Sequence, residues 1–391
     1  IHKYPHLAWP HPRMDFESEA IRWWRHWLGG ERAGADMLPA HRLFVSEAVR
    51  PATRRERDPG RWVAVGAARE ALHLHPRPDG RLGAAEAGEA TIRTALDCGT
   101  AGGEHFTVNN GPDLPADQNA DDGMSAKWET PPLAEPVEVI GRPRLRTRVA
   151  IDAPVGTLVA RLVDVHPDGT AHRVSLGVLN LTHRHGSAWP EPMRPGHAEH
   201  VEIVLDATGY RFLPGHRIRL AVSTAYFPLV LPPPAEVTAT LDLGASELAL
   251  PRAEVTEIDI PEPTADGPRP FPATGEGRAD RVVHTSRDTG RTTVTVTDET
   301  PEIAHPVHGL AWADARRSEW SITRGDPLSL EGHEEARMMR RRDGVETLVT
   351  ATGRLRATAT HWLVEQGIEA RENGRTVFER RWSRSFPRDG N

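Results

Sequence analysis

The chain has 391 residues, of which 48 are Lys or Arg and 55 are Asp or Glu, so its formal net charge is -7. A chain of this length is expected to bury more than one core, and its single cysteine, Cys98, excludes an intrachain disulfide and a cysteine-based zinc site. Without a basic stripe no nucleic-acid partner is expected, and without an apolar run of ~18 residues no membrane partner is expected.

The first predicted element is a helix from Asp15 to Leu28. Asp15 can cap its first turn, two glutamates suit its positive end, and Gly29-Gly30 ends it. Apolar residues recur at helical spacing, namely Phe16, Ala20, Trp23, Trp24, Trp27 and Leu28. This broad apolar face requires a partner surface, which could be the helix's own domain or a neighbouring one.

From about Leu43 to Leu250, short segments rich in Val, Leu and Thr alternate with Pro, Gly and Asp, a pattern typical of an antiparallel all-β domain. The predicted strands are Leu43–Ser46, Arg61–Ala64, Leu145–Ile151, Thr157–Val165, Arg173–Asn180, His200–Asp206 and Arg217–Thr224. The turn His166-Pro167-Asp168-Gly169 is strongly indicated, because Pro presets the first turn dihedral and Gly tolerates a positive φ.

Residues 259–280 are rich in Pro and Gly and lack an apolar period, which indicates a linker. Beyond them a hairpin is predicted over Arg281–Val296 and a meander of longer strands over Glu331–Ser383. The pair Asn373-Gly374 suits a type I′ hairpin turn. We therefore expect residues 281–391 to form an additional antiparallel β domain.

Several motifs occur in an order and spacing that resemble the CocE/NonD serine hydrolases, the group of cocaine esterase and X-Pro dipeptidyl-peptidase. They are Ile1–His6, Leu158–Gly169, Gly177–Leu181, Pro214–Leu220 and Phe227-Pro228. The resemblance implies a mainly β C-terminal portion: residues 1–40 as the one-helix remnant of an α/β-hydrolase domain, then residues 41–258 as a galactose-binding-like jelly-roll β-sandwich. It also implies that the aromatic helix packs on the hydrolase core.

The same resemblance assigns His2 the role of the general base in a Ser-Asp-His triad. No Gly-x-Ser-x-Gly elbow is present: Ser125 and Ser246 each follow a Gly two residues earlier but lack the second Gly. The nucleophile and the acid are therefore expected upstream, in a missing N-terminal hydrolase domain. The parent enzyme would hydrolyse a small ester or amide substrate, and this chain alone would be inactive.

Other candidate sites carry weaker signals. The histidines near His2 and the pairs His73/His75 and His183/His185 lack a third ligand, the loop with Asp113, Asp117, Asp121 and Asp122 is interpreted as hydrated, and scattered tryptophans (Trp9, Trp62, Trp128, Trp189 and Trp320) are more typical of core. No metal or other cofactor is expected. Alternatives to the hydrolase are a carbohydrate-binding β-sandwich and an oligomerisation scaffold; a homo-oligomer is a further expected partner, and a cytoplasmic location is favoured over secretion.

Overall fold

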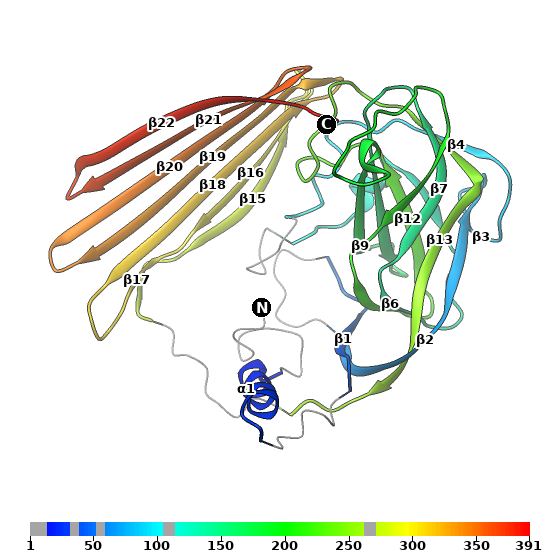
Figure 1. Cartoon of the computed structure of the whole chain (residues 1–391), viewed down its shortest axis with the longest axis horizontal. Coiled ribbons are helices and arrows are strands. Elements are labelled where there is room, and N and C mark those ends of the chain that lie inside the picture. The colour runs from blue at the N-terminus through cyan, green and yellow to red at the C-terminus, as the bar shows by residue number, and fades with distance from the viewer. Residues whose placement is uncertain (1–13, 32–38, 52–58, 105–113, 262–270) are drawn as a thin grey trace.

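The structure is a computed structural model and describes residues 14–31, 39–51, 59–104, 114–261 and 271–391 (Figure 1). His2 lies outside these ranges. The described chain is mainly β. Its helical elements are α1 (Phe16–Trp27), the short α2 (Asn119–Asp122) and the 3-10 turn η2 (Leu181–His183). None of the helices in these ranges is both long and apolar enough to cross a membrane.

Two sheets form the N-terminal part of the β structure. Sheet I has nine strands: β1 (Arg42–Glu47), β2 (Gly60–Pro76), β3 (Leu82–Gly83), β4 (Glu89–Ile92), β6 (Val137–Gly141), β7 (Arg144–Ile151), β10 (Glu199–Val204), β11 (Thr208–Phe212) and β13 (Ala239–Glu257). Sheet II has four: β5 (Ala126–Glu129), β8 (Thr157–Val165), β9 (Ala171–Asn180) and β12 (Arg217–Ser223). The pairing is antiparallel except between β1 and β11, which run parallel.

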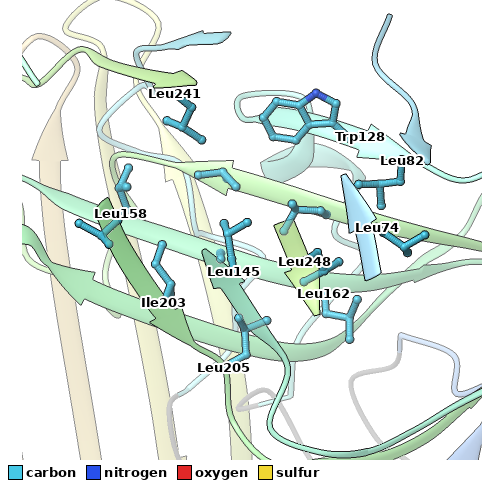
Figure 2. Packing of buried hydrophobic residues seen from close by; sticks show 14 of the residues in the cluster. Leu74, Leu82, Trp128, Leu145, Leu158, Leu162, Ile203, Leu205, Leu241 and Leu248 are labelled. Carbon is cyan, nitrogen blue, oxygen red and sulfur yellow. The ribbon is translucent and has the colours of Figure 1, made fainter. Parts of the chain in front are cut away.

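Sheets I and II pack face to face as a β-sandwich, and leucines from both line the core between them (Figure 2). Leu145 of β7 and Leu248 of β13 meet Leu162 of β8 in this cluster. Every residue of β8 is buried, because the second face of sheet II is covered by the segment that carries Cys98 and α2. Sheet II is thus enclosed on both sides, as a continuous apolar strand requires.

Sheet III contains the C-terminal strands and is antiparallel throughout. Its strands are β14 (Ala273–Thr274), β15 (Arg278–Thr285), β16 (Arg291–Glu299), β17 (Glu302–Ala304), β18 (Ala311–Thr323), β19 (Asp326–Arg342), β20 (Val345–Ala357), β21 (His361–Glu372) and β22 (Arg375–Pro387). From β18 onward each strand pairs with the next, so the meander predicted from the sequence is present. Asn373 and Gly374 have φ values of 48° and 80°, as a type I′ turn requires.

Sheet III is joined to the sandwich by a packed junction. Leu96 and Phe227 from the sandwich cluster with Val294, Ile322 and Leu330 of sheet III. At its margin, Asp97 accepts hydrogen bonds from Thr292 Oγ1 at 3.1 Å and from Arg324 Nε at 2.8 Å.

The C-terminal residues after β22 fasten the same junction. Arg388 donates from Nη2 to the Pro232 carbonyl at 2.5 Å and lies over the Trp362 ring, 4.0 Å from its centre. The Gly390 carbonyl accepts from Asn180 and Thr182 of the sandwich. Since apolar contacts and hydrogen bonds both cross the junction, sheet III is fixed to the sandwich rather than tethered to it.

The predicted elements in the first half agree closely with the structure. Asp15 caps α1 by accepting from the Ser18 amide at 3.0 Å, and α1 ends one residue before Leu28. All seven predicted strands are present, six of them within two residues at both ends. The main difference is length: β2 extends to Pro76, and β13 spans a region for which the sequence predicts no strand.

Candidate functional site

The helix α1 is attached to the sandwich by its charged side. Glu19 accepts a hydrogen bond from Arg42 Nη2 on β1 at 2.8 Å and another from Arg22 on its own helix. Partial burial acts to raise the pKa of Glu19, but the two guanidiniums outweigh it and lower the pKa. The ionised carboxylate therefore holds the polar side of α1 against β1.

The aromatic side of α1 is left in solvent. Trp24 and Trp27 are each 57% exposed and Leu28 is 77% exposed, while the Trp23 and Trp27 rings contact each other at 5.6 Å. An amphipathic helix normally buries its apolar stripe and exposes its charges. In the described part of the chain, α1 is inverted: it exposes a cluster of large apolar side chains of the kind that marks an interaction surface.

A second candidate is a buried polar cluster between β8 and β12. Asp164 is fully buried and accepts from Tyr210 Oη at 2.7 Å and from His216 Nδ1 at 2.9 Å. His166 lies beside them, its ring 4.5 Å from that of His216, and donates from Nε2 to the Val49 carbonyl at 3.1 Å. Burial lowers the pKa of His166, and the nearby Asp164 charge offsets this only in part.

Asp164, His166 and His216 have the residue types and the proximity of a metal site, since one ligand atom from each lies within 4.8 Å of the others. Their hydrogen bonds point to a different role. A backbone carbonyl only accepts, so His166 Nε2 carries a proton and cannot ligate through that atom. The carboxylate likewise has a donor on each oxygen. These three residues therefore fit a closed hydrogen-bond network better than a metal site.

Sequence reasoning missed this cluster, although a signal was present. Val165 pairs with Arg217 in the register of β8 and β12, so His166, which follows β8, lies opposite His216, which precedes β12. Pairing of the two predicted strands would have brought the histidines together.

The acidic loop corrects one prediction. Asp121 and Asp122 are fully buried rather than hydrated. Asp121 accepts from the Gly99 and Ala101 amides at 2.9 and 3.1 Å. Asp122 binds two guanidiniums that project from neighbouring strands, Arg161 at 3.1 Å and Arg219 at 2.5 Å. Asp122 supplies the counter-charge that buried Arg161 requires, while Arg219 is shared between Asp122 and Glu129. Asp113 lies outside the described residues.

Neither rejected serine is built as a nucleophile. Ser125 Oγ accepts from Arg161 Nη2 at 2.6 Å and donates to the Asp121 carbonyl at 2.8 Å. Ser246 is buried and bonds to Thr147 Oγ1 at 2.7 Å. Cys98 is buried as expected, and burial raises the pKa of its thiol to about 11. Ser125 is half-buried with its hydroxyl held by these two hydrogen bonds, and Ser246 and Cys98 are buried.

The histidine pairs of the sequence analysis have separate partners. His73 contacts Glu247 at 3.0 Å, His75 donates to the Ser246 carbonyl at 2.9 Å, and His185 lies 3.8 Å from Glu199. Among the tryptophans, Trp62 and Trp128 are buried and Trp189 is exposed. The candidate general base His2, together with His6, His11 and Trp9, lies outside the described residues.

Comparison with known proteins gives matches to one group of hydrolases. A 130-residue stretch is 36% identical to cocaine esterase from Rhodococcus sp. (strain MB1 Bresler), covering 32% of this chain and 22% of the esterase. A putative serine esterase from Mycobacterium bovis is 30% identical over 126 residues, covering 28% of this chain and 20% of that protein. The chain therefore spans about a fifth of the length of these curated relatives.

Solved structures also align with parts of the chain. An aminopeptidase from a marine sediment Thaumarchaeota archaeon aligns with a TM-score of 0.48 and 19% identity, covering 59% of this chain and 43% of that one. A CocE/NonD family hydrolase from Staphylococcus aureus aligns with a TM-score of 0.45 and 14% identity, covering 61% and 46%.

The family model gives the broadest match. The model described as the X-Pro dipeptidyl-peptidase C-terminal non-catalytic domain covers residues 44–301, which include the whole sandwich and the first strands of sheet III. On this evidence the chain belongs to the X-Pro dipeptidyl-peptidase C-terminal domain family, as a C-terminal portion of the CocE/NonD type.

Proposed function

We propose that this chain is the C-terminal part of a serine acyl hydrolase, that it holds only the histidine of the catalytic triad, and that it packs against the rest of an α/β-hydrolase domain. The observation that carries the proposal is the inverted helix α1, which is bound through Glu19 and Arg42 and presents its tryptophans outward. On this view residues 1–40 are the end of the hydrolase domain, and the exposed aromatic face of α1 is the surface on which its core packs.

In this proposal sheets I and II form a jelly-roll sandwich over residues 41–258, residues 259–280 link it to the C-terminal unit, and His2 is the general base. His2 would take the proton of a serine outside this chain as that serine attacks an ester or amide carbonyl. The proton would then pass to the leaving group, and an acidic residue would orient the imidazole. The hydrogen bonds that hold the Ser125 hydroxyl and the burial of Ser246 and Cys98 support placing the nucleophile elsewhere.

Phosphonate labelling of the full-length gene product tests the proposal. The full-length product should hydrolyse a p-nitrophenyl ester, and a fluorophosphonate should label one of its serines. The present chain should remain unlabelled. The His2→Ala variant should abolish labelling and turnover, whereas His185→Ala, on the surface of the sandwich, should retain both. Labelling of the present chain alone, or full activity of His2→Ala, would contradict the proposal.

A further inference from the structure

The two faces of sheet III differ in chemistry. On one face, here the outer face, arginines and glutamates form a ladder of ion pairs: Arg354–Glu331, Arg356–Glu365, Arg371–Glu369 and Arg381–Glu379. The opposite, inner face carries the residues that pack on the sandwich, among them Val294, Ile322 and Ala357. Since paired residues in antiparallel strands share a face, the register extends this assignment along every strand.

Beyond the junction the inner face carries an apolar patch that is flanked by two ion pairs, Arg316–Glu334 and Arg340–Asp314. Apolar residues that are cross-strand neighbours form two rows on this face. The first row crosses the four strands β19 to β22 and contains Met338, Val349, Ala370 and Phe378; the second crosses β19 to β21 and contains Ala336, Ala351 and Ile368. We call these seven residues the distal patch. Met338 is 50% exposed and Phe378 is 48% exposed, and none of the seven is buried. A sheet face of this composition normally packs on another layer.

The distal patch is continuous with an interface that the chain already forms. Its strands run from the junction with Leu96 and Phe227 outward, and the same inner face is buried at the junction and bare beyond it. Figure 1 shows sheet III and the sandwich diverging from this junction, with α1 at the open end between them. The hydrogen bonds of Asp97 and Arg388 hold the two arms at this angle.

Charge argues against a second copy of the chain as the occupant. The edge strand β22 carries four arginines, at positions 375, 380, 381 and 384, against one glutamate, Glu379. Antiparallel self-pairing would set arginines opposite each other, which blocks edge-to-edge association. Arg380 and Arg384 on the inner face pair with no carboxylate among the described residues, so the occupant should present acidic groups beside an apolar surface.

We propose that the distal patch is a second docking surface for the hydrolase domain, which lies between sheet III and α1 and contacts both. The inference rests on the proposed function and extends it: sheet III acts as an arm that holds the catalytic domain from the side opposite α1. One globular body in this position covers the two apolar surfaces that the chain itself leaves bare. The surface of the hydrolase domain that faces β22 carries acidic residues.

Thiol labelling tests this directly, because the native Cys98 is buried. Adjacent positions on β20 give a matched pair: Ala351→Cys places a thiol on the inner face and Thr350→Cys places one on the outer face. In the present chain both variants should react with a maleimide at similar rates. In the full-length gene product Ala351→Cys should react roughly tenfold more slowly than Thr350→Cys, because only the inner face is covered.

The outcomes separate the two proposals. Equal rates in a full-length product that still labels with fluorophosphonate overturn the docking surface and leave the proposed function standing. A full-length product without a reactive serine overturns the proposed function. If the Ala351→Cys thiol of the present chain becomes more protected as the protein concentration rises, the occupant is a second copy of the chain. If the thiol is protected only when anionic phospholipid vesicles are added, the occupant is a membrane. Either result overturns the inference.

A charge substitution provides an independent check. Val349→Asp puts a carboxylate into the centre of the distal patch, and Thr350→Asp puts the same group on the outer face. In the full-length product only Val349→Asp should weaken protection of the Ala351→Cys thiol, while in the present chain the two variants should have the same melting temperature. Equal protection in both variants contradicts the proposal.

Discussion

The junction between the sandwich and sheet III can be tested with one hairpin, because β15 and β16 each carry a valine in opposite environments. Val294 is 1% exposed and packs in the cluster with Leu96 and Phe227, whereas Val282 is 52% exposed. Val294→Ala removes two buried methyl groups, which costs about 0.8 kcal/mol each in transfer free energy plus the cavity that remains. We expect the free energy of unfolding to fall by about 2–3 kcal/mol, against about 0.5 kcal/mol or less for Val282→Ala.

Urea denaturation followed by tryptophan fluorescence and by far-UV circular dichroism gives the measurement. If the sandwich and sheet III unfold together, the urea concentration at the midpoint should fall equally by fluorescence and by circular dichroism for Val294→Ala. Leu96→Ala removes the partner side chain from the sandwich, so the double variant should lose less stability than the sum of the single variants. Equal effects of Val294→Ala and Val282→Ala, or strict additivity with Leu96→Ala, would refute the packed junction.

Two further predictions concern buried titratable groups. The lowered pKa of His166 means that the unfolded chain binds this proton more readily, so stability is complete above about pH 6.5 and falls below it by at most about 1.4 kcal/mol per pH unit. His166→Gln, which keeps a donor for the Val49 carbonyl, should flatten the fall seen in urea titrations at acidic pH, and an unchanged slope would count against the assignment. The thiol of Cys98, with its pKa raised to about 11, should react with iodoacetamide only when the chain unfolds; rapid alkylation of the native protein would disprove its burial.

The predictable part of the fold depends on local signals. Strand β8 is rich in apolar residues and is bounded by the turn that Pro167 and Gly169 specify, so its ends follow from the sequence. The helix α1 is equally local, since its cap, apolar period and terminating glycines lie within the segment. Where propensity, pattern and turn chemistry agree, the sequence identifies the element.

The missed parts depend on partners distant in the chain. Strand β13 contains Pro251, which demotes a strand in sequence reasoning, and its register shifts between Leu250 and Arg252 accommodate it. The burial of Asp122 depends on Arg161 and Arg219, which are charged residues in mostly apolar strands. Each of these features becomes visible only after strand pairing is known.

The sequence of this chain forms more regular apolar faces than the chain itself buries. In α1 and in the distal patch, the spacing of apolar residues is as regular as in β8, yet only β8 is enclosed. The seven residues of the distal patch lie side by side on the inner face, whereas the outer face of sheet III carries ion pairs such as Arg354–Glu331 and Arg356–Glu365. Exposing such faces favours aggregation, so their regularity supports the proposal that a partner covers both surfaces. The apolar pattern that specifies the core of the sandwich therefore also specifies two surfaces that the sandwich and sheet III do not cover themselves.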